Sequence, residues 1–199
     1  MTDAARAALA DAVSLWRLTP AVAKDVIDAA TDALVAGLDS PSLRILAGEP
    51  ASATAYELAD LIDDTMCELG LADVLEDDVQ RAALAAMLRR LRAGRVRPGE
   101  LVSWAHVCIG HGGHDDAQPF VQLDDVYDLW ASEGHDLGLL DRWTHEEADA
   151  FLAGLPSPGR ADEWMSGPPP AATPARPPVA RPSPPRRGRF ARLFARRRS

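Results

Sequence analysis

The sequence has little cysteine and no long apolar run. Cys67 and Cys108 are the only cysteines among 199 residues, so a disulfide framework is implausible and a reducing compartment is favoured. No window reaches about 18 consecutive apolar residues, so we expect no membrane-spanning helix. Residues 1–16 lack the basic start and unbroken apolar core of a secretory signal. We therefore expect a cytoplasmic protein, with the membrane surface as an alternative location.

Several motifs of catalysis and nucleotide binding are also absent. The sequence contains no G-x-S-x-G, no phosphate-binding P-loop and no G-x-G-x-x-G. It lacks long Val/Ile/Thr alternation, which would indicate strands, and residues 1–165 hold no basic patch interleaved with aromatic residues, as base stacking requires. These absences exclude the best-marked nucleophile and nucleotide sites.

Acidic residues are confined to one part of the chain, and the other part has only basic ones among its charged residues. Residues 1–165 hold 12 basic residues and all 30 acidic ones, a formal charge of −18, whereas residues 166–199 hold nine arginines and no acid. The overall charge of −9 is the sum of these two parts. A disordered acidic chain is excluded because 47% of the residues are hydrophobic and five are tryptophan.

Residues 1–155 are predicted to form one compact all-α domain. Its Ala-rich and Leu-rich segments favour helix because Ala loses no side-chain entropy and Leu loses little. We expect about eight short helices, over approximately residues 3–18, 20–37, 43–47, 54–69, 77–92, 98–109, 119–130 and 144–154.

Two helix starts carry specific capping signals. Ser40 precedes Pro41, which combines a good N-cap with a proline at the first helical position. Thr144 and Glu147 match the capping box, in which the two residues bond each other's backbone amides. The second signal predicts that the last helix begins at Thr144.

The C-terminal part changes in composition. Residues 156–185 contain 11 of the 16 prolines, which predicts an extended linker in a disordered tail. Residues 186–199 then form a basic amphipathic segment with apolar side chains at helical spacing. The contact residues predicted there are Arg186, Arg187, Arg189, Phe190, Arg192, Leu193, Phe194, Arg196, Arg197 and Arg198.

The run from His106 to Asp116 contains residue types that bind zinc or iron. On one continuous helix, His106 and Cys108 would point about 200° apart. After a helix break at Gly110, the side chains that can converge on one ion are Cys108, His111, His114 and Asp115. The spacing matches no specific zinc pattern, and the alternative is that His111 and His114 interact with the helix C-terminus.

Acidic helix faces form a second candidate site. On a helix, Asp124 and Asp128 share a face, as carboxylates that hold Mg²⁺ must, and D-D-x-x-D resembles the aspartate-rich motif of isoprenoid synthases. Two such faces could flank one Mg²⁺ cluster, as in all-α nucleotide pyrophosphatases, or simply be solvated surface. The residues concerned are Asp124, Asp125, Asp128, Asp60, Asp63 and Asp64.

Residues 32–48, 103–113 and 119–128 resemble segments of small helical proteins from GC-rich bacteria. The resemblance implies an all-helical fold and identifies no catalytic residue. Some small acidic helical proteins of this kind are immunity or adaptor proteins.

Two functional hypotheses follow. The first is a non-enzymatic interaction or regulatory protein, adaptor-like or immunity-like and without a cofactor, whose acidic body binds a partner with a basic surface. Its tail would contact an anionic membrane, a nucleic acid or the acidic body. The alternative is a small metal-dependent hydrolase that uses Zn or Mg at residues 106–116, where a bound ion would activate water.

Overall fold

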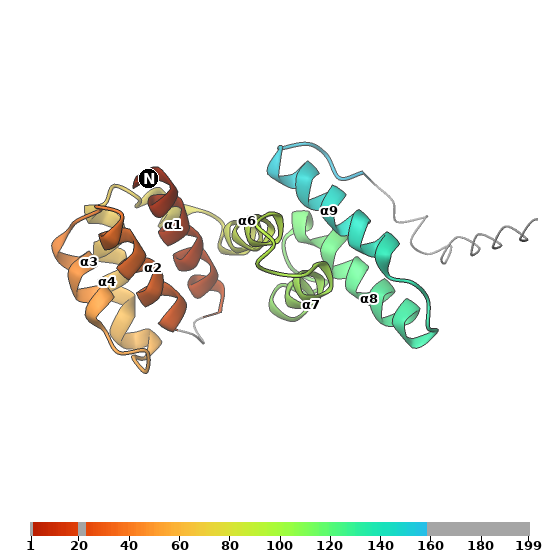
Figure 1. The fold of residues 1–199 in the computed structure, drawn as a ribbon, viewed down its shortest axis with the longest axis horizontal. Coiled ribbons are helices and arrows are strands. Elements are labelled where there is room, and N and C mark those ends of the chain that lie inside the picture. The colour runs from red at the N-terminus through yellow and green to blue at the C-terminus, as the bar shows by residue number, and fades with distance from the viewer. Residues whose placement is uncertain (1, 20–22, 159–199) are drawn as a thin grey trace, which may run out of the picture. The chain divides into compact units, whose positions relative to one another are not determined.

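The computed structural model describes residues 2–19 and 23–158, which belong to the first of two compact units, residues 1–168. All regular secondary structure in these residues is helical (Figure 1), which confirms the predicted all-α class. The helices are α1 (Thr2–Leu18), α2 (Ala23–Val35), α3 (Pro41–Gly48), α4 (Ala55–Glu68), α5 (Asp73–Glu76), α6 (Val79–Arg92), α7 (Pro98–Cys108), the 3₁₀ helix η1 (Asp115–Ala117), α8 (Gln118–Ser132) and α9 (Gly138–Leu152).

Local capping chemistry explains several of these boundaries. The Leu43 amide donates to the Ser40 side chain at 3.2 Å, and Pro41 occupies the first turn of α3, as predicted. α4 begins with a capping box that joins Thr54 and Glu57. The predicted start of the second helix includes residues 20–22, which lie outside the described residues. The sequence prediction missed α5 and η1, which are each a single turn.

The predicted start of the last helix is wrong. α9 begins at Gly138, and Thr144 lies inside it, where its hydroxyl donates to the Leu140 carbonyl at 2.9 Å. Leu140, Trp143 and Ala148 are buried and recur at helical spacing, so the apolar face of the helix extends upstream of Thr144. The capping-box pattern is therefore coincidental here, and Thr144 is a buried residue.

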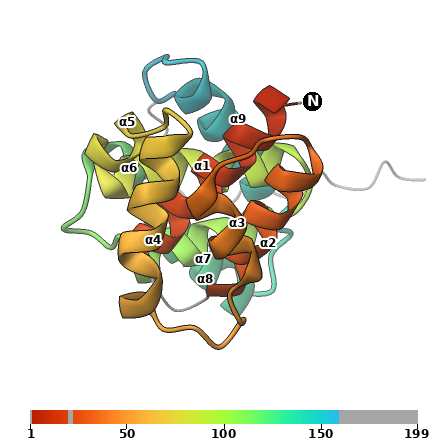
Figure 2. The same cartoon turned by 90° about the vertical axis from the view of Figure 1, so that its left-hand side faces the viewer.

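The first four helices share one apolar core. Each contributes to it fully buried side chains, among them Leu9, Val26, Leu43 and Ile62. Helix α1 packs on α2, α2 on α3, and α3 on α4, and Figure 2 faces this group.

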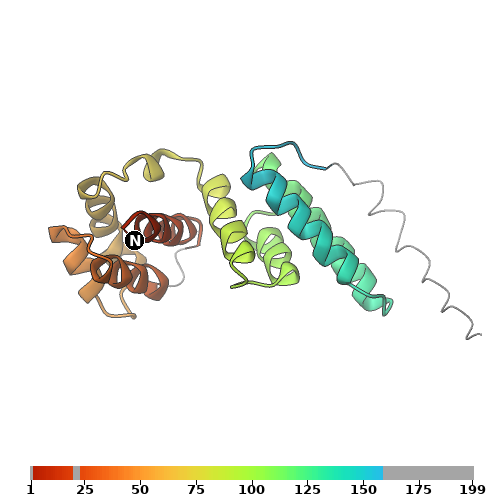
Figure 3. The ribbon, with the colours of Figure 1, turned by 45° about the horizontal axis from the view of Figure 1, so that its top comes forward.

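Helices α6 to α9 share a second core. Its largest buried side chains include Leu88 of α6, Leu101 of α7, and Phe120 and Trp130 of α8. α7 packs on α8, and both contact α9. α8 and α9 lie side by side (Figure 3). This second core holds the elements of the candidate site.

Helices α1 and α6 join the two cores. They pack directly on each other, and Leu15 and Leu18 of α1 pack against the core of α6 to α9. At the surface of this contact, the Arg89 Nε atom donates to the Asp11 carboxylate at 3.0 Å. The α1–α6 contact therefore makes residues 2–19 and 23–158 a continuous packed structure.

Within residues 2–19 and 23–158, no helix is both long and apolar enough to cross a membrane. The predicted linker, from residue 159 onward, and all predicted contact residues of the basic tail lie outside the described residues.

The buried position of Thr144 generates the first prediction. Thr144→Asp should reduce the free energy of unfolding by at least about 2 kcal/mol, because it buries a carboxylate in an apolar core. Urea denaturation of the full chain measures this change.

Thr31→Asp is the matched control. Thr31 also donates to the carbonyl four residues earlier, at 3.0 Å, but it is exposed, so its replacement should change stability by less than about 1 kcal/mol. Asp is as good an N-cap as Thr. If Thr144→Asp left the free energy of unfolding unchanged, that result would contradict the buried position of Thr144 and support a helix start there.

Candidate functional site

The turn between α7 and α8 is fixed by glycine and by two glutamine side chains. Gly110 follows the helix with φ +71°, in the left-handed region that glycine adopts without strain. The Gln118 amide donates to the carbonyl oxygens of Gly110 and Gly113 at 3.2 and 3.3 Å. The Gln80 side chain of α6 accepts from the His114 amide at 2.7 Å. The loop that carries His111 is therefore held in place from both sides.

Gly113 also permits a close approach of the chain to the end of α7. A Cβ atom there would lie 2.3 Å from the Ile109 Cγ2 atom and 2.7 Å from the Ile109 carbonyl oxygen. Because only glycine avoids this overlap, Gly113 allows the loop to fold back and carry His111 toward α8.

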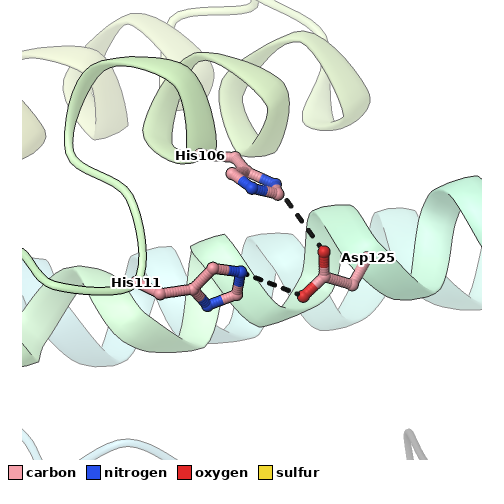
Figure 4. Close-up of side chains that lie close together, drawn as sticks. All are labelled: His106, His111 and Asp125. Atoms are coloured by element: carbon pink, nitrogen blue, oxygen red, sulfur yellow. Dashed lines mark ion pairs between the residues drawn. The ribbon is translucent and has the colours of Figure 1, made fainter.

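His106, His111 and Asp125 form a side-chain cluster across α7, the loop and α8 (Figure 4). Each can offer one ligand atom within 4.8 Å of those of the other two. The Asp125 carboxylate lies 3.7 Å from His106 Nδ1 and 3.5 Å from His111 Nε2. The two imidazole rings meet edge to face, with centroids 5.0 Å apart.

Asp124 orients the inner histidine of this cluster. Its Oδ2 atom lies 2.8 Å from His106 Nδ1, which is hydrogen-bonding distance. The side chain of Asp124 is only 14% exposed, whereas those of Asp125 and His111 are 53% and 58% exposed. The cluster therefore has a fixed inner pair, His106 and Asp124, and an outer pair that is open to solvent.

The predicted metal set does not come together. Of Cys108, His111, His114 and Asp115, only His111 belongs to the single three-ligand cluster found within the described residues. Cys108 lines a pocket elsewhere on α7, and the His114 side chain accepts from the Asp116 amide at 3.1 Å. Asp115 is exposed at the start of η1. His106 and Asp125 complete the cluster instead, because the His106 side chain points from α7 to α8.

The two predicted acidic faces also separate. Asp124 and Asp125 contact the histidines, whereas Asp128 is exposed one turn further along α8. Asp60, Asp63 and Asp64 are exposed on α4, whose buried side belongs to the other core. In the described part of the chain, no carboxylate of α4 joins the cluster.

The sequence reasoning missed His106 as a member of the site. One signal was available: α8 contains no lysine or arginine, so Asp124 and Asp125 have no cation on their own helix. Any cationic or hydrogen-bonding partner would come from another element, and the histidines that precede α8 are near candidates in the sequence.

A separate apolar pocket of about 810 Å³ opens beside α7. Trp104, Val107, Cys108, Tyr127 and Leu137 are among the residues that line it. We call this the α7 pocket. Val107 is 81% exposed, so apolar surface is presented to solvent at its edge.

The polar groups of the α7 pocket already bind one another. The Tyr127 hydroxyl donates to Asp141 at 2.8 Å, and burial raises the pKa of this tyrosine. The Arg97 Nε atom donates to Glu100 at 3.0 Å, and this hydrogen bond lowers the pKa of the Glu100 carboxyl. The pocket therefore offers apolar contact area, bordered by the Arg97–Glu100 ion pair and by the Tyr127–Asp141 hydrogen bond.

The chain matches no protein-family model, and neither curated proteins nor solved structures include one that matches it.

The close approach at Gly113 generates a second prediction. Gly113→Ala should reduce the free energy of unfolding by about 1–3 kcal/mol, because the added methyl group overlaps the Ile109 backbone. Gly112→Ala is the control, since a Cβ atom there meets nothing within 4 Å. Urea denaturation should separate the two variants. Equal stabilities would show that the loop does not approach α7 as described.

Proposed function

We propose that this chain is an interaction protein whose α7 pocket binds an apolar side chain of a protein partner, flanked there by basic residues. The supporting observation is the apolar pocket itself, with Val107 exposed at its edge and Trp104 in its wall. Burial of one exposed valine-sized side chain contributes roughly 1.5–3 kcal/mol to association. An anchor residue in a pocket of this kind is typical of energetically dominant interface positions.

The charge of the chain favours a basic partner. Arg97, Glu100 and Asp141 line the α7 pocket. Arg97 offsets the charge of Glu100, so Asp141 leaves the lining net negative, and residues 1–165 carry a formal charge of −18. A field of this sign raises the association rate of basic partners and disfavours acidic ones. Asp141 is hydrogen-bonded to the neutral Tyr127 hydroxyl and keeps its charge, so it contributes to the negative field, and the apolar wall supplies the contact energy.

Synthetic peptides can test this proposal with the full-length protein. We expect binding of immobilised peptides that carry a central Leu or Phe between arginines. The same peptides with a central Ser, or with Glu flanks, should bind at least tenfold more weakly. Equal binding of the Ser-centred peptides would contradict the proposal, because charge alone would then explain the affinity. Failure of every peptide to bind would also contradict it.

A pair of valine variants locates the binding surface. Val107→Asn should weaken binding of the Leu-centred peptide about tenfold, because the substitution removes apolar contact area without adding charge. Val35 of α2 is 82% exposed and lies outside the α7 pocket, so Val35→Asn should leave the affinity unchanged. Equal affinities of the two variants would exclude the α7 pocket as the contact.

The basic tail is a second contact in this proposal. Phe190, Leu193 and Phe194 lie among arginines, a pattern that favours insertion into an anionic membrane surface. Full-length protein should float with phosphatidylserine-containing vesicles, and Ser at these three positions should abolish flotation. Salt-sensitive duplex-DNA binding that survives the triple substitution, without flotation of the parent protein, would assign the tail to nucleic acid instead.

A further inference from the structure

We propose that His106, His111 and Asp125 bind one divalent transition-metal ion, with Zn²⁺ as the reference ion. Two imidazoles and one carboxylate are a ligand set that such ions accept, and three protein ligands leave at least one coordination position open. The residues come from α7, the following loop and α8. They are not part of the lining of the α7 pocket, so this site is independent of the proposed partner contact.

The distances in the cluster fit one small ion. Ligand atoms that lie about 2.0–2.1 Å from a tetrahedral zinc ion are roughly 3.3 Å from each other. The Asp125 Oδ1 atom lies 3.7 Å from His106 Nδ1, the Asp125 Oδ2 atom lies 3.5 Å from His111 Nε2, and one ligand atom of each residue lies within 4.8 Å of those of the other two. These side chains must therefore draw together around the ion, and those of His111 and Asp125 are more than half exposed.

The local charge favours a cation. In the described part of the chain, the ion-pair partners of Asp124 and Asp125 are the two histidines alone. With neutral imidazoles, the four side chains carry a charge of −2, which a divalent ion neutralises.

Asp124 has a supporting role in this site. Its oxygen lies 2.8 Å from His106 Nδ1, closer than two ligands of one zinc ion approach each other. In the metal-free protein this carboxylate orients the ring of His106. Binding of the ion through His106 Nδ1 breaks this hydrogen bond and releases its proton to solvent, which leaves Asp124 available to the metal or to a bound water.

The ligand types determine which ion is favoured. Mg²⁺ prefers an octahedron of oxygen ligands and keeps several waters, whereas imidazole suits zinc, copper and nickel. The site should therefore discriminate strongly against Mg²⁺, even though the surrounding surface is acidic.

Titration calorimetry of the tag-free full-length protein with ZnCl₂ tests the assignment. We expect one ion per chain, with millimolar Mg²⁺ unable to displace it. His111→Ala and Asp125→Asn should each weaken Zn²⁺ binding at least tenfold. Both positions are largely exposed, so the metal-free variants should keep the melting temperature of the parent protein. Zn²⁺ should raise the melting temperature of the parent and not of the variants.

Three control variants distinguish the proposed ligands from other side chains nearby that can bind a metal. Cys108→Ala and His114→Ala remove members of the metal-ligand set predicted from the sequence. Asp128→Asn removes an exposed carboxylate from α8, the helix that carries Asp125. All three should bind Zn²⁺ like the parent protein. The proposal would be overturned if the parent protein did not bind Zn²⁺. It would also be overturned if Cys108→Ala or His114→Ala weakened Zn²⁺ binding while His111→Ala did not.

Discussion

The folded-back turn after α7 is the constraint on which the candidate site depends. α7 ends at Cys108, Gly110 takes a left-handed conformation, and Gly113 approaches the helix end more closely than any other residue permits. Without this reversal, His111 would continue along the direction of α7 and away from α8. The two glutamine side chains that bond the loop then hold His111 beside Asp125. A few backbone positions therefore determine which side chains meet.

Helix α7 presents different chemistry on its different sides. Leu101, Val102 and Ala105 are buried in the second core. His106 points to the carboxylates of α8, while Val107 and Cys108 line the α7 pocket. Because successive helical residues are about 100° apart, Ala105, His106 and Val107 serve three separate surfaces. This explains how a metal site and a partner-binding pocket could share one short helix without sharing residues.

The fold could be predicted from local signals, and the site could not. Ala-rich and Leu-rich segments, the Ser40 cap and the glycine after α7 indicated the helices, because these signals act over a few residues. The error at Thr144 arose because a capping-box pattern can also occur inside a helix, where burial overrides it. The His106–Asp124 contact spans 18 positions and depends on how α7 packs on α8. The predicted helix break at Gly110 favoured Cys108 and His114, but Cys108 lines the α7 pocket and the His114 side chain accepts from the Asp116 amide.

X-ray absorption spectroscopy of the Zn²⁺-loaded full-length protein tests the central assignment most directly. The account predicts a first shell of nitrogen and oxygen atoms at about 2.0–2.1 Å, with the outer-shell scattering of two imidazole rings. His111→Ala should remove one of these rings from the spectrum. A sulfur shell at about 2.3 Å would place Cys108 on the metal, and that result would contradict both the ligand set and the described orientation of α7.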